Sequence, residues 1–168
     1  MPRLAEGEFA LVREHLERAI QSPTDPVRWG SAMTDLDFHI LCAEAAAQTR
    51  DAAGLAEHAP PAEEGAQRLG HRLYQGIAHR ARGVALLLES QPAAAVEPFG
   101  RAVEIFVDLG TRWQLGRTLV DLAEAHASGG DQAAARADYT RALEAFEAVG
   151  AGPAAEEVRR AIQLGQAQ

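Results

Sequence analysis

Two stretches of sequence, forty residues apart, decide the fold. Residues 91–110 read QPAAAVEPFGRAVEIFVDLG, and residues 131–150 read DQAAARADYTRALEAFEAVG. Extending the comparison to residues 83–110 against 123–150 gives nine identical positions. A glycine preceded by an apolar residue closes each stretch, and Gly70 stands forty residues before Gly110. Self-similarity at a fixed period of this length is the signature of a repeat architecture.

Within one repeat the apolar residues follow a helical period, and signals for helix ends bracket them. Gly129 and Gly130 end the preceding helix, Asp131 can cap the next one, and Gly150 can take the left-handed conformation after it. The repeat is therefore predicted to be a helix, a tight turn, a second helix and another turn. The stripe that one helix face would bury consists of Ala135, Tyr139, Ala142, Leu143 and Phe146.

The same signals predict helices along the whole chain. A first helix is expected near 5–21, followed by pairs at 26–49 and 51–69, 71–90 and 92–109, and 111–128 and 131–149, with a last helix near 153–165. We predict one domain, 1–168, with a half repeat at 5–21, repeats at 26–70, 71–110 and 111–150, and a capping helix at 153–165. The opening helix matches the second helix of a repeat, because Val12, Leu16, Ala19 and Ile20 stand where Ala135, Tyr139, Ala142 and Leu143 do.

Two repeats also share a pattern of small and aromatic residues. A small residue in the first helix is followed in the second helix by a small residue, an aromatic residue four positions on, and an alanine three positions after that. These roles fall to Gly83, Ala95, Phe99 and Ala102, and to Ala123, Ala135, Tyr139 and Ala142.

This pattern resembles the tetratricopeptide repeat (TPR) family. The forty-residue period is similar to the long-repeat bacterial variant found in the repeat region of LuxR-type activators and of cyclase-linked ATPases. The resemblance implies an all-α fold, a right-handed α-solenoid of antiparallel helix pairs with about eight helices. It implies a scaffold and not the activity of those multidomain proteins, because no ATPase or DNA-binding segment occurs in this chain.

Several positions depart from the family pattern. Arg82 stands where the pattern has Leu, as at Leu122, so the helix is either rotated or lets Arg82 emerge at an edge. Pro60 and Pro61 predict a break in the second helix of the first repeat, and Pro98 predicts a bend in the next second helix.

The composition limits the function classes. The net charge is −8 with 16 basic residues, all of them Arg, which argues against the basic stripe that nucleic-acid binding requires. The single cysteine, Cys42, excludes an internal disulfide, and no apolar run approaches the roughly 20 residues that span a bilayer. We therefore expect a cytoplasmic protein with no nucleic-acid or membrane partner. The 36 alanines favour helices over strands.

The resemblance also indicates a binding face, because the first helix of each pair lines the concave groove in this family. An apolar centre with Arg80 and Arg117 would suit an extended or helical peptide that carries carboxylates, since guanidinium and carboxylate pair in a bidentate fork. The alternative is a solvated face without a partner. The groove positions carried over to this sequence are Asp37, Ile40, Glu44, Ile77, Arg80, Val84, Leu87, Arg117, Val120 and Glu124.

Other candidate sites are weaker. Asp35, His39 and Cys42 share one face of a helix and could hold a metal, but a hydrogen-bonded histidine beside a buried cysteine is favoured. His71 and His79 are given the same interpretation. Trp113 could anchor a partner, but packing against the neighbouring repeat is favoured.

We found no motif of a phosphate-binding loop, nucleophile elbow or zinc protease. We therefore expect no enzyme activity, no metal and no cofactor. The leading hypothesis is a protein-interaction scaffold that binds a peptide or protein through its groove. The alternatives are a homo-oligomerising module, such as a homodimer, and a regulatory module that senses a small ligand.

Overall fold

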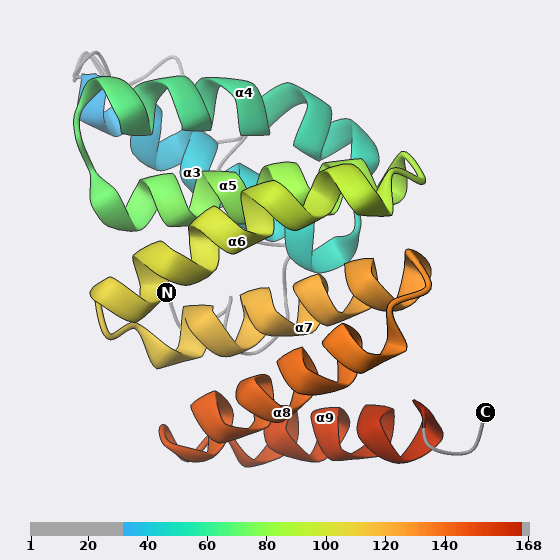
Figure 1. Cartoon of the computed structure of the whole chain (residues 1–168). Coiled ribbons are helices and arrows are strands. Elements are labelled where there is room, and N and C mark those ends of the chain that lie inside the picture. Colours follow the sequence, from blue (N-terminus) through green and yellow to red (C-terminus); the bar gives the residue numbers. More distant parts are fainter. Residues whose placement is uncertain (1–31, 166–168) are drawn as a thin grey trace. The chain divides into compact units, whose positions relative to one another are not determined.

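The computed structural model describes residues 32–165, and these residues form seven helices and no strand (Figure 1). The predicted all-α fold is confirmed over this range. The helices are α3 (Ala32–Thr49), α4 (Ala52–Arg68), α5 (Arg72–Leu88), α6 (Pro92–Asp108), α7 (Arg112–Ser128), α8 (Gln132–Glu147) and α9 (Gly152–Gly165). The ends of α4 to α9 lie within two residues of the predicted ends. The helix predicted at 5–21 lies outside the described residues.

The helices fall into two compact units, Met1–Ala85 and Leu86–Gln168. In the first unit α3 packs on α4, and polar contacts join α4 to α5. In the second unit α7 packs on both α6 and α8, and α9 packs on α8. Within each unit the helices therefore pack on their neighbours in the sequence, which is consistent with a helical-repeat solenoid.

Each turn from α3 to α9 contains one residue with a left-handed backbone, and these residues recur every twenty positions. The forty-residue glycines adopt positive φ angles of 64° at Gly70, 66° at Gly110 and 69° at Gly150, as predicted for Gly150. At the alternate turns the left-handed residues are Arg50 at φ 55°, Ser90 at φ 60° and Gly130, so two of these three turns use a residue that has a side chain. The sequence revealed the period of forty through its glycines, and the backbone shows that each helix and its turn occupy half of that period.

Side chains and prolines fix the helix starts. Asp131 accepts a hydrogen bond from the backbone N–H of Ala134 at 2.9 Å, which confirms the predicted cap of α8. Asp51 caps α4 in the same way, through the N–H of Gly54 at 3.1 Å. Pro92 occupies the first turn of α6, where its missing N–H costs nothing.

The small and large positions of the repeat form the core of the second unit. Ala95 and Ala102 are both 0% exposed, and so are the aromatic residues Phe99 and Phe106. Between α7 and α8 the fit is closest at Gly116, where a Cβ atom would lie 2.8 Å from the ring of Phe146. Small residues at fixed places therefore let neighbouring helices approach aromatic rings.

The predicted break at Pro60 and Pro61 is wrong, because α4 runs unbroken from Ala52 to Arg68 with both prolines inside it. The two missing N–H groups would have bonded to the carbonyls of Ala56 and Glu57, and both of those residues are exposed, so water can satisfy the carbonyls. Packing keeps the helix together around the prolines, since Ala62 is 0% exposed. Pro98 likewise lies inside an unbroken helix, α6.

Arg82 emerges at the surface, as one of the two alternatives for this position predicted. Its side chain is exposed, and its Nη1 lies 3.2 Å from Oε2 of Glu63 on α4. The equivalent Leu122 is 6% exposed. The Arg at this position therefore links the edges of two helices, whereas Leu122 contributes to the core.

Candidate partner-binding surface

Nine of the ten predicted groove positions, all except Leu87, recur at the same three places on successive first helices. Counting in steps of forty, Asp37, Ile77 and Arg117 are equivalent, and the other two sets follow the same register on α3, α5 and α7. We call the side of each first helix that carries these positions its first-helix face. Its accessibility differs sharply between the two units.

In the first unit the first-helix face is largely covered. Ile40 is 2% exposed, Ile77 7% and Val84 0%, so these side chains belong to the core. Arg80 is 4% exposed, and its Nη1 lies 3.6 Å from Oε2 of Glu44, which is 8% exposed. Here the chain itself places a carboxylate beside the guanidinium that the sequence predicted to face a peptide.

Asp37 is half-buried, and it also has an internal partner. The Tyr74 hydroxyl on α5 donates a hydrogen bond of 2.7 Å to Oδ1 of Asp37 on α3. Burial of the phenol, followed by this hydrogen bond, raises the pKa of Tyr74 to about 12. Tyr74 therefore stays protonated and donating across the physiological range, and it ties α3 to α5.

In the second unit the same face is more open. Arg117, Val120 and Glu124 on α7 are all half-buried, and so is Leu87 near the end of α5. These three positions of α7 place a cation, an apolar residue and an anion along one side of one helix. They are the predicted groove residues that a partner could reach most directly.

The first-helix face continues onto α9, which the sequence prediction did not include. Steps of forty from Arg117, Val120 and Glu124 lead to Glu157, Arg160 and Leu164, and all three are exposed. Leu164 is 70% exposed, the highest value among the exposed large apolar side chains of the described residues. The same forty-residue count that identified the other positions would have found these three.

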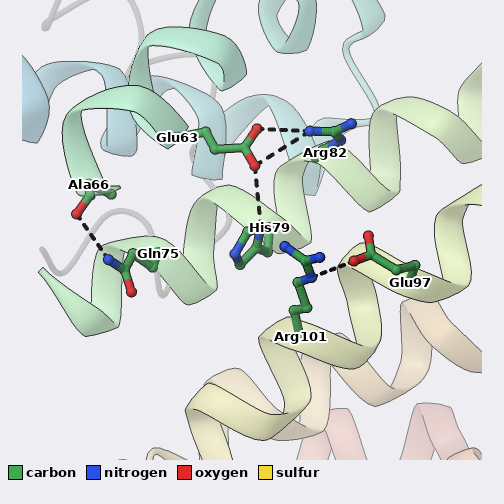
Figure 2. A network of polar contacts seen from close by, with 7 residues as sticks. All are labelled: Glu63, Ala66, Gln75, His79, Arg82, Glu97 and Arg101. Carbon is green, nitrogen blue, oxygen red and sulfur yellow. Dashed lines mark hydrogen bonds and ion pairs between the residues drawn. The ribbon is translucent and has the colours of Figure 1, made fainter. Parts of the chain in front are cut away.

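Polar contacts between helices involve residues that the sequence did not single out as sites. Figure 2 shows Glu63 on α4 facing two side chains of α5, with its Oε1 3.5 Å from Nδ1 of His79 and its Oε2 3.2 Å from Nη1 of Arg82. Nearby, the Gln75 amide donates to the backbone carbonyl of Ala66 at 3.2 Å. In the second unit Asp138 on α8 plays a similar part, with one oxygen 2.9 Å from Nδ1 of His126 on α7. These partners are nine or more residues apart in the sequence, so no local motif predicts the contacts.

The metal candidates are not brought together. His39 on α3 faces His58 on α4 instead, with 3.2 Å between their Nδ1 atoms, and Cys42 is buried. His71 stacks on Tyr74, with ring centroids 3.9 Å apart. His79 lies instead beside Glu63 on α4. Among the described residues no group of three or more His, Cys, Asp or Glu is arranged to hold a metal ion.

The histidine pair stands beside a small polar cavity between α3 and α4. The cavity has a volume of about 170 Å³ and is lined by Asp35, His39, Glu64 and Arg68 among others. Burial, followed by the charge of His58, lowers the pKa of His39 below its usual 6.5, against smaller opposing effects of Asp35 and Glu57. A hydrogen bond between two Nδ1 atoms needs a proton on one ring and a lone pair on the other, so the pair resists double protonation.

Trp113 contacts an aromatic residue of its own repeat. Its ring centroid lies 5.4 Å from that of Phe146 on α8, and the side chain is 45% exposed. This contact lies within one repeat, and packing of Trp113 against the neighbouring repeat, the favoured interpretation from sequence, stays a prediction. The half-exposed indole leaves one face accessible at the start of α7.

No protein-family model and no curated protein match this chain. Over residues 32–165, none of the helices combines the length and apolar character that crossing a membrane requires.

Proposed function

We propose that this chain is a non-catalytic TPR-like scaffold that acts in the cytoplasm and binds a peptide or protein through its first-helix face. The observation that supports the proposal most is the accessibility of this face in the second unit. There its positions are half-buried on α7 and exposed on α9, whereas most of its positions in the first unit are buried. Repeat arrays commonly use such extended faces to bind other chains.

The side chains on this face indicate the chemistry of the partner. Val120 and Leu164 supply apolar surface, Arg117 and Arg160 supply cations, and Glu124 supplies an anion. A partner with apolar residues flanked by carboxylates would fit, because each Arg can receive a carboxylate through two parallel hydrogen bonds. Either an extended segment or an amphipathic helix can present such a pattern.

The titratable groups of the described residues support a structural role. Glu44 with Arg80, Glu63 with His79, and Asp138 with His126 each join two helices. The cavity beside His39, at about 170 Å³, is smaller than the roughly 300–1,000 Å³ typical of small-molecule sites. A partner-binding surface is therefore favoured over a ligand-sensing pocket between α3 and α4.

The test is a selection from a displayed peptide library, followed by affinity measurements on single variants. Val120→Glu and Leu164→Glu should each weaken the selected peptides by about tenfold or more, which corresponds to roughly 1.4 kcal/mol. Val107→Glu is the matched control, because Val107 is 54% exposed on α6 and lies off the first-helix face. Unchanged binding in both face variants would reject the proposed surface.

Arg117→Glu tests the carboxylate preference separately. It should weaken peptides with acidic residues more than peptides without them. Arg80→Glu is not a useful probe, because it would bury a second acid beside Glu44 and destabilise the fold.

A further inference from the structure

A groove between α8 and α9 is lined by none of the residues of the first-helix face. It has a volume of about 380 Å³, and Ala135 and Tyr139 of α8 and Ala161 and Ile162 of α9 line it. Arg136 is the one charged residue of its lining, which contains no acid. The groove is therefore mainly apolar, with a single positive charge.

The repeat register indicates what kind of element fits this groove. The first residue of α9 follows that of α7 by forty positions, so α9 stands in the register of a first helix. Ile162 is equivalent to Leu122, which is 6% exposed, and Tyr139 is equivalent to Phe99, which is 0% exposed. Both groove residues are only half-buried. In the preceding repeat a second helix, α8, packs on α7, so the groove occupies the place of the second helix that would complete the repeat begun by α9.

The chain contains a further segment with the sequence of a second helix. Residues 5–21 place Val12, Leu16, Ala19 and Ile20 in the pattern of the α8 stripe, and they lie within the 31 residues that precede the described part. With 17 residues, the segment has the length of α4, α5, α6 and α7. It carries four Glu and two Arg, and this net negative charge complements Arg136 in a groove without acids.

We propose that residues 5–21 of a second copy of this chain dock in the α8–α9 groove and complete the repeat that α9 begins. The contact joins two different surfaces, so it is head-to-tail. Each copy then offers one segment and one groove, and association continues into rings or open chains.

Light scattering over a wide range of protein concentration tests the proposal on the full chain. The unsubstituted chain should increase in mass with concentration. Ile162→Glu, which blocks the groove, and Leu16→Glu, which blocks the segment, should each remain monomeric. Gln163→Glu is the matched control, because it adds the same charge to an exposed position of α9 outside the groove lining and should associate normally.

Mixing the two blocked variants provides the decisive step. The Ile162→Glu chain keeps an intact segment and the Leu16→Glu chain keeps an intact groove, so an equimolar mixture should form a dimer and stop there. Circular dichroism of each variant establishes that it folds, and Ile162→Ala, which preserves helix propensity, should weaken association without abolishing the fold.

Three results would overturn the proposal. The unsubstituted chain could remain monomeric up to the millimolar range, which would include the case where residues 5–21 dock within their own chain. The mixture could stay monomeric although both variants fold and both have lost association. Finally, Gln163→Glu could abolish association as completely as Ile162→Glu does. Val120→Glu on the first-helix face should leave association unchanged, so failure here is distinguishable from failure of the proposed peptide site.

Discussion

The α3–α4 and α7–α8 pairs fill the same space between helices with the large and small residues exchanged. In α7–α8 the first helix carries Gly116, and Phe146 of the second helix packs against it. In α3–α4 the first helix carries Leu36 at the position equivalent to Gly116, and its Cδ1 would lie 3.0 Å from a Cβ atom on Gly65. The repeat therefore maintains the volume between its helices, and either helix can supply the large side chain.

The two pairs also differ in their ring contacts. Between α7 and α8 Trp113 packs on Phe146, whereas between α3 and α4 Phe38 lies at the edge of both rings of the His39–His58 pair. Loss of an aromatic ring should therefore have its largest effect in the second unit, and the lowered pKa of His39 should make the first unit sensitive to mild acid.

Phe146→Ala should have the largest effect on stability. Phe146 is 3% exposed, so removing its ring leaves a cavity between α7 and α8 and should lower the free energy of unfolding by about 3–5 kcal/mol. Urea unfolding measures this change. Val149→Ala, at a position that is 47% exposed, is the control and should change stability by about 0.5 kcal/mol or less. A loss below about 1 kcal/mol for Phe146→Ala would contradict the packing described.

The effect of Gly116→Ala on stability should change sign when Phe146 is also replaced by Ala. In the natural chain the added methyl group meets the Phe146 ring and should cost about 1–3 kcal/mol. In the Phe146→Ala background the ring is absent, so the better helix propensity of Ala should stabilise the chain by up to about 1 kcal/mol. Gly100→Ala on α6, where a Cβ atom meets nothing within 4 Å, should be stabilising in both backgrounds. Equal effects of Gly116→Ala in the two backgrounds would show that the two residues are not coupled.

Stability should fall in mild acid because of the α3–α4 pair. The pKa of His39 is lowered in the folded chain, so below pH 6.5 the unfolded chain binds a proton that the folded chain resists. The free energy of unfolding should be retained above pH 6.5 and should decrease as the pH falls from there through the lowered pKa. Urea midpoints between about pH 7.5 and 5 measure the slope. His39→Gln should reduce the dependence of the urea midpoint on pH, whereas the control His71→Gln should leave it unchanged. An unchanged slope in His39→Gln would show that His39 does not cause the pH dependence.

Exchanging the turn residues should give the smallest effects. Ser90 and Gly110 hold nearly the same backbone, with φ angles of 60° and 66°, and no atom lies within 4 Å of a Cβ on Gly110. Ser90→Gly should relieve backbone strain and stabilise by about 0.5 kcal/mol, while Gly110→Ser should cost about 1 kcal/mol. Thermal unfolding of both variants measures the difference, and effects of the same sign would contradict it.

The sequence predicted the helices well because their ends have local chemical signals. Asp131, Pro92 and the forty-residue glycines fix where helices start and stop, and each acts over only a few residues. The turns at Arg50 and Ser90 lack such a signal, since their left-handed backbones are imposed by the repeat and not by glycine. The break predicted at Pro60 and Pro61 was wrong because tertiary packing outweighs a local helix breaker in α4.

The candidate surface was predicted less well, because accessibility depends on distant partners. The register placed Arg80 and Arg117 on the first helices of successive repeats, but no local signal shows that Arg80 lies beside Glu44, thirty-six residues away. His58 was missed for the same reason. Folding the sequence back about the turn at Arg50 would have indicated that His39 and His58 face each other.

Hydrogen exchange of the chain with and without a selected peptide tests the central claim, that the partner binds the accessible first-helix face of the second unit. The account predicts that the peptide slows amide exchange in α7 and α9, and that Val120→Glu abolishes this protection while Val107→Glu preserves it. Protection confined to α3, α4 and α5, or protection of α7 and α9 that survives Val120→Glu unchanged, would contradict it.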